Sequence, residues 1–102
     1  MNNAGHGKSN TNFCFETSEK NPLGSVTTSY LYKNTYGCVV TEQNIGGQKL
    51  RVLSVCDREG YPFPSKQDYA EILDFFDMGG YEETFDVPHR VGKSRYFMKK
   101  IA

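Results

Sequence analysis

Several features that would define a class of protein are missing from this chain of 102 residues. It has no tryptophan and no excess charge, because twelve Lys and Arg balance twelve Asp and Glu. It has no run near the roughly 20 apolar residues that a transmembrane helix needs, and its first ten residues lack the apolar segment of a secretory signal. We therefore expect a cytoplasmic protein whose net charge does not steer it toward nucleic acid or membranes.

Cysteine is scarce, and its spacing matches no metal or disulfide motif. Cys14, Cys38 and Cys56 are widely separated, with neither a Cys-x-x-Cys pair nor a zinc-finger spacing. The two histidines, His6 and His89, have no metal-ligand spacing either. The sequence therefore predicts free thiols and no metal or cofactor.

The first 24 residues are poor in apolar side chains. They are rich in Asn, Gly, Ser, Thr and Lys, and the group at Phe13 and Phe15 is their only apolar concentration. Such a segment cannot offset the entropy lost on ordering, so we expect a flexible tail over residues 1–24 and one folded domain over residues 25–102. Two alternatives stay open for Phe13 and Phe15: a short edge strand on the domain, or a motif that binds a partner.

Alternating β-branched and aromatic residues occur in several short segments. They predict strands over residues 26–32, 38–43, 49–56, 82–87 and 94–101. Gly46-Gly47 fits a two-residue type I′ hairpin turn. In that register Glu42 faces Arg51, an opposite-charge pair. The same register places Cys38 and Cys56 on opposite faces of the sheet, so no bridge between them is expected.

Residues 61–80 are typical of one helix with both of its ends marked. Ser65 is followed three residues later by Asp68, a short capping box, and Gly79-Gly80 fits a left-handed exit. Apolar residues at helical spacing form one stripe that we expect to face the sheet, namely Tyr69, Ile72, Leu73 and Phe76. The predicted fold class is α+β, an antiparallel sheet in the order β-β-β-α-β-β packed against one amphipathic helix.

Charge is segregated along the second half of the chain. Residues 65–86 hold seven acidic residues against one lysine, and residues 88–102 hold five basic residues and no acidic one. One interpretation is two solvated faces that lie against each other; the other is a surface that binds a macromolecule. For the second, the predicted protein-binding residues are Glu71, Asp74, Asp77, Glu82, Glu83, Phe13 and Phe15.

The basic, aromatic end of the chain allows an alternative function. Aromatic side chains on a sheet can stack on bases while Lys and Arg contact phosphates. The nucleic-acid-binding candidates are Arg90, Lys93, Arg95, Tyr96, Lys99 and Lys100. A catalytic interpretation would need a pair such as Cys56 and His89. No complete catalytic set is evident, so we predict binding rather than catalysis.

Four local motifs lie between residues 50 and 101. They are a strand ending in Ser54-Val55-Cys56-Asp57, a Pro64-Ser65-x-x-Asp68 helix start, a strand ending at Pro88 and a final aromatic strand. In this pattern the chain resembles small uncharacterised proteins of phages and prophages. The resemblance implies a short accessory protein of a mobile element that binds a host macromolecule, in some cases as an inhibitor of a defence system. We also expect that exposed edge strands allow a homodimer.

Overall fold

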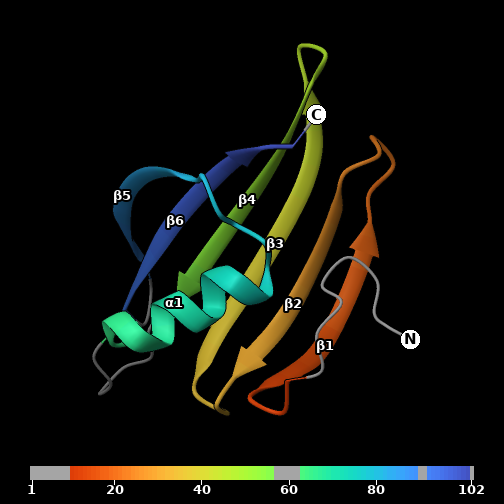
Figure 1. Cartoon of the computed structure of the whole chain (residues 1–102). Coiled ribbons are helices and arrows are strands. Elements are labelled where there is room, and N and C mark those ends of the chain that lie inside the picture. Colours follow the sequence, from red (N-terminus) through yellow and green to blue (C-terminus); the bar gives the residue numbers. More distant parts are fainter. Residues whose placement is uncertain (1–9, 57–62, 90–91, 102) are drawn as a thin grey trace.

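The computed structural model describes residues 10–56, 63–89 and 92–101. These residues form six strands and one helix: β1 (Phe13–Lys20), β2 (Val26–Tyr32), β3 (Tyr36–Ile45), β4 (Gln48–Cys56), α1 (Lys66–Phe75), β5 (Glu82–His89) and β6 (Gly92–Lys100). The strands make one antiparallel sheet in the order β1-β2-β3-β4-β6-β5 (Figure 1). The predicted α+β class, an antiparallel sheet with a single helix, is confirmed, with one strand more than predicted.

The additional strand, β1, lies within the segment that was predicted to be a flexible tail. It pairs with β2 from Phe13 to Lys20, so the edge-strand alternative is the one found. Amino-acid composition did not indicate this strand, because the groups that stabilise it lie elsewhere in the sequence. Its backbone forms hydrogen bonds with β2, and the side chain of Phe13 contacts a ring that is distant along the chain. The ring of Phe13 stacks on Phe75 with 3.9 Å between centroids. Residues 1–9 lie outside the described residues.

The β3–β4 hairpin has the predicted register. Glu42 pairs with Arg51, and the turn residues Gly46-Gly47 have φ values of 57° and 80°, as a type I′ turn requires. Cys38 pairs opposite Val55, which puts it on the other face of the sheet from Cys56. The three cysteines are free, as predicted.

The start of α1 is the predicted one. Ser65 has an extended conformation, and its Oγ accepts a hydrogen bond from the backbone N–H of Asp68 at 3.1 Å. This bond satisfies one of the unpaired N–H groups of the first helical turn.

The end of α1 differs from the prediction, because Asp77 rather than Gly79-Gly80 makes the left-handed exit. Asp77 has φ of 54°, and its N–H donates to the carbonyl of Asp74 at 3.1 Å. The next N–H, of Met78, donates to the carbonyl of Leu73 at 2.9 Å, which completes a Schellman motif. Met78 is fully buried, so the helix stops where this apolar side chain turns into the core.

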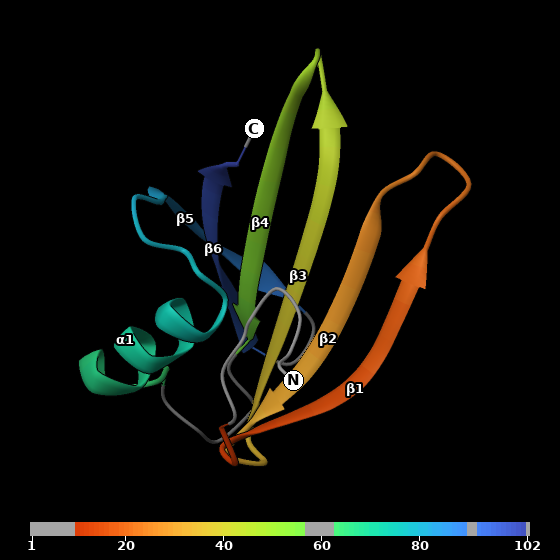
Figure 2. The same ribbon diagram turned by 45° about the vertical axis from the view of Figure 1, so that its right-hand side comes forward.

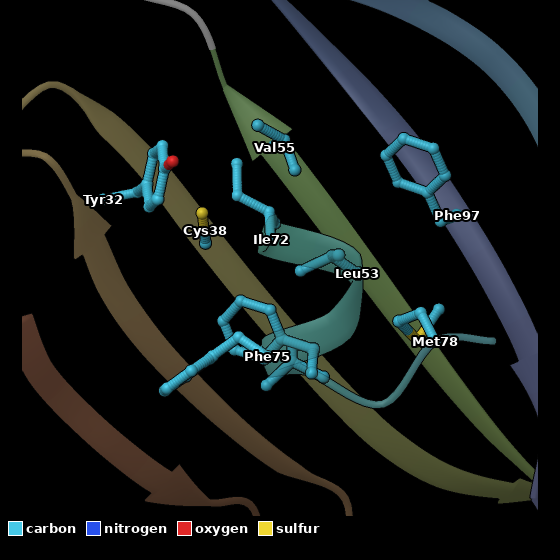
Figure 3. Packing of buried hydrophobic residues seen from close by; sticks show 10 residues of the cluster. Tyr32, Cys38, Leu53, Val55, Ile72, Phe75, Met78 and Phe97 are labelled. Atoms are coloured by element: carbon cyan, nitrogen blue, oxygen red, sulfur yellow. The ribbon is translucent and has the colours of Figure 1, made fainter. Parts of the chain in front are cut away.

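One hydrophobic cluster joins the helix to the sheet (Figure 3). Its buried members are Tyr32, Cys38, Val40, Leu53, Val55, Ile72, Phe75, Phe76, Met78 and Phe97. Of the predicted helical stripe, Ile72 and Phe76 are buried, while Tyr69 and Leu73 are partly buried against the cluster. The helix lies on one side of the sheet (Figure 2). We call that face the helix side and the opposite face the open side.

Candidate interaction surface

Glu71, a predicted protein-binding residue, lies in a hydrogen-bond network that joins α1 to the segment entering β1. Its Oε2 accepts from the side-chain amides of Asn10 at 2.7 Å and Asn12 at 2.9 Å. The hydroxyl of Tyr32 donates to Oε1 over 2.6 Å. These donors, led by Tyr32, lower the pKa of Glu71. We infer that Glu71 acts mainly as a structural residue.

Asp68 belongs to the same network through Tyr32. The Tyr32 hydroxyl lies 3.0 Å from Asp68 Oδ1, which also accepts from Lys33 Nζ at 2.9 Å. Lys33 first, and then Tyr32, lowers the pKa of Asp68. The side chain of Tyr32 is fully buried, and burial together with its bonds to Glu71 and Asp68 raises its pKa. The hydroxyl therefore stays protonated, and its single proton lies between the two carboxylates, of which Glu71 is the nearer.

Asp77 lies at a helix end that two cations neutralise. Lys99 Nζ donates to the Asp77 carbonyl at 2.8 Å, and Arg51 Nη1 donates to the carbonyls of Phe76 at 3.1 Å and Asp77 at 3.2 Å. The Asp77 carboxylate lies 3.7 Å from Lys99 and 3.9 Å from Arg51, with 72% of the side chain exposed. Positive charge at these carbonyls offsets the negative end of the helix dipole.

The two phenylalanines of β1 have different surroundings. Phe13 stacks on Phe75, and its centroid lies 4.8 Å from that of Tyr32, so it is part of the aromatic packing at the edge of the core. Phe15 is 56% exposed, and its ring meets that of Tyr30 nearly perpendicularly with 5.7 Å between centroids. Tyr30 in turn contacts Phe75, which connects the exposed ring to the helix.

The remaining acidic candidates are divided between the two sides of the sheet. Asp74 is exposed and adjoins Phe75 in α1. Glu82 is exposed and pairs with Met98, which belongs to the open side because it lies opposite Val52. The side chain of Glu83 lies outside the described part of the structure. The helix side therefore presents Phe15, Asp74 and the carboxylate of Asp77, which we call the acidic–aromatic surface.

The nucleic-acid candidates do not gather on one side of the described structure. The guanidinium of Arg95 lies over the rings of Phe63 at 4.5 Å and Tyr69 at 5.4 Å on the helix side. Lys99 lies on the same side at the end of α1. Tyr96 pairs with Ser54 and, like Lys100, belongs to the open side. Arg90 lies outside the described residues, and so does the side chain of Lys93.

The catalytic candidate Cys56 lies on the open side of the sheet. Its Sγ is 3.0 Å from Ser94 Oγ, at the edge of a hollow of about 460 Å³. Uncharged side chains line this hollow: Val39, Thr41, Gln43, Val52, Ser54, Cys56, Ser94 and Tyr96. On the helix side, burial raises the pKa of the Cys38 thiol to about 12, so this thiol is a core residue.

Residues 10–56, 63–89 and 92–101 contain no group of three or more His, Cys, Asp or Glu that could hold a metal ion. The helix in these ranges is too short and too polar to cross a membrane.

Comparisons of the chain with protein-family models, with curated proteins and with solved structures give no match. The resemblance to phage and prophage proteins therefore stays a prediction.

Proposed function

We propose that this chain is a small interaction protein that binds a partner protein and does not act as a catalyst. Its role is that of an accessory protein of a phage or other mobile element, which binds a host protein, for example to inhibit a defence system. One observation carries the proposal: three of the four exposed large apolar side chains among the described residues, Phe15, Leu23 and Val26, lie on the β1–β2 hairpin. A partner that covers this hairpin would take these side chains out of water, which favours association.

On the helix side, which also carries Phe15, the acidic–aromatic surface adds the exposed carboxylates of Asp74 and Asp77. In this proposal α1 is an amphipathic helix that packs against the sheet, and the side chains of Asp74 and Asp77 face solvent. Interfaces commonly place an aromatic anchor at the centre and charged residues at the rim. The expected partner therefore has a pocket that accepts the ring of Phe15 and basic side chains around it. Rim charges of this kind mainly speed association and exclude wrong partners.

Charge reversal with a matched control tests the proposal. Tagged wild type, Asp74→Lys and Glu19→Lys are used to capture proteins from a lysate of the host. Both substitutions replace an exposed carboxylate, but Glu19 lies on the open side, opposite Thr27. We expect wild type and Glu19→Lys to recover the same partner and Asp74→Lys to recover several-fold less. Equal recovery by all three proteins would contradict the proposal.

The nucleic-acid alternative has no observation in its favour, because its described candidates lie on two sides of the sheet. It predicts a mobility shift of DNA or RNA at low salt that disappears as salt is raised. A shift that is lost in Arg95→Ala and Lys100→Ala would replace the protein-binding proposal with this alternative.

A further inference from the structure

β1 is attached to the rest of the protein at few points. Seven of its eight residues are exposed, and Phe13 is the exception. As the first strand of the sheet it pairs with β2 alone, and a register shift between Phe15 and Thr17 interrupts this ladder. Elements with few buried contacts and exposed backbone hydrogen bonds open more easily than the core. Among β1 to β4, whose side chains are all described, β1 is therefore the strand that we expect to detach most readily.

The site that β1 and the residues before it occupy is specific for the sequence of the segment bound there. Glu71 binds two side-chain amides, those of Asn10 and Asn12, and Phe75 stacks on the ring that follows, Phe13. A segment that fits must carry amide, spacer, amide and aromatic residues in this order in an extended conformation. Residues 10–20 of a second copy of this chain meet the requirement by identity.

Pairing of a second copy with the outer edge strands of the sheet is less favourable than exchange of β1. Both edge strands have a register shift, β1 between Phe15 and Thr17 and β5 between Glu83 and Asp86. β5 also contains Pro88, which has no N–H to donate to a ladder. Irregularities of this kind are how edge strands avoid pairing with another chain. Exchange of β1 avoids this obstacle, because the incoming strand repeats the native irregular pairing with β2.

The connection between β1 and β2 supplies a hinge. It spans residues 21–25 and contains Pro22 and the positive-φ residue Gly24. Leu23, at its tip, is 95% exposed. When two copies exchange their first strands, their hinges extend and run beside each other, so that Leu23 of one copy can pack on Leu23 of the other.

We propose that β1 is exchanged between two copies of the chain, giving a strand-swapped dimer in which residues 10–20 of each copy pair with β2 of the other. The hydrogen bonds and ring contacts of β1 that break on opening are formed again in the dimer. The packing of Leu23 is gained. This proposal does not depend on the proposed partner-binding function.

A cross-link between β1 and β2 distinguishes exchange from a closed monomer. Ser18 and Thr28 are directly paired, with 3.2 Å between their hydroxyl oxygens. The test protein carries Ser18→Cys and Thr28→Cys in a Cys14→Ser background, so that the exposed native thiol does not react. It is equilibrated at micromolar to millimolar concentrations, oxidised and run on a non-reducing gel. We expect covalent dimers whose share rises with concentration, whereas cross-linked monomers alone at every concentration would overturn the proposal.

A second measurement does not rely on new cysteines. The mass of wild type and Leu23→Ser is determined by size-exclusion chromatography with light scattering across the same concentrations. Because Leu23 is 95% exposed, its replacement should leave the monomer folded and lower the dimer fraction several-fold. A wild type that is monomeric throughout, or a dimer fraction unchanged by Leu23→Ser, would contradict strand exchange.

Discussion

Residues of one type have different surroundings in this protein. Glu71 and Asp74 are one helical turn apart, yet Glu71 is held by Asn10 and Asn12 while Asp74 is exposed. The sequence predicted the Ser65 cap because its partner is three residues away. It did not predict the contacts of Glu71, because no local pattern encodes them. Asn12 and Asn10 are separated from Glu71 by 59 and 61 positions along the chain.

Glu71→Gln should reduce the acid sensitivity of the fold. The pKa of Glu71 is lowered below its ordinary value of 4.5, so its carboxylate stabilises the fold fully above that value. This stabilisation is lost as the pH falls through the lowered pKa. Urea unfolding from pH 6 to pH 3 should therefore show a smaller loss of stability for Glu71→Gln than for wild type. The control Glu19→Gln should follow wild type; identical curves for all three would refute the assigned role.

The left-handed conformation of Asp77 predicts the order of its substitutions. A β-branched side chain is strained at a φ of 54°, so Asp77→Val should lower the free energy of unfolding by about 1–2 kcal/mol. Asp77→Gly removes the strain, and the carbonyl contacts to Arg51 and Lys99 use the backbone. It should lie within about 0.5 kcal/mol of wild type, because surface changes are usually that small. Equal losses in urea unfolding for both variants would contradict the helix end described here.

Among the helices and strands, α1 and the β3–β4 hairpin were predicted from the sequence. The residues that mark the start of the helix and the turn of the hairpin are neighbours along the chain. β1 was predicted only as one alternative to a flexible tail, for a physical reason. Its register shift between Phe15 and Thr17 breaks the period-two pattern that indicates a strand. The turn sequence Asn21-Pro22-Leu23-Gly24 was the available signal for a hairpin at this place.

Phe13→Ala and Phe15→Ala should separate the packing of β1 from its exposed surface. Phe13 stacks on Phe75, so its truncation should cost about 2 kcal/mol, less than a fully buried phenylalanine. It should also speed hydrogen exchange in β1 while β3 and β4 stay protected. Phe15 is 56% exposed, so Phe15→Ala should change stability by about 0.5 kcal/mol or less. The reverse ranking would show that the two rings have been assigned the wrong roles.

At the scale of the whole molecule, charge that is segregated along the sequence is partly paired in space. Lys99 of β6, from the basic segment 88–102, lies at the carboxyl end of the acidic helix. Arg51 of β4, which is outside that segment, lies there as well. This agrees in part with the interpretation that the two charged segments lie against each other. What the sequence could not show is which acidic side chains remain exposed on the helix side, because that depends on the strand order. Asp74 and Asp77 do, on the side of the sheet that also carries the exposed ring of Phe15.

The central claim is that the exposed ring of Phe15 binds a partner protein, and calorimetric titration of that partner tests it most directly. The matched variants are Phe15→Ala and Ile45→Ala, which truncate apolar side chains that are 56% and 53% exposed, on β1 and on the β3–β4 hairpin. We predict that Phe15→Ala raises the Kd about tenfold or more, or about 1.4 kcal/mol, as expected for an anchor residue, and that Ile45→Ala leaves it unchanged. A Kd equal to that of wild type for Phe15→Ala would contradict the account.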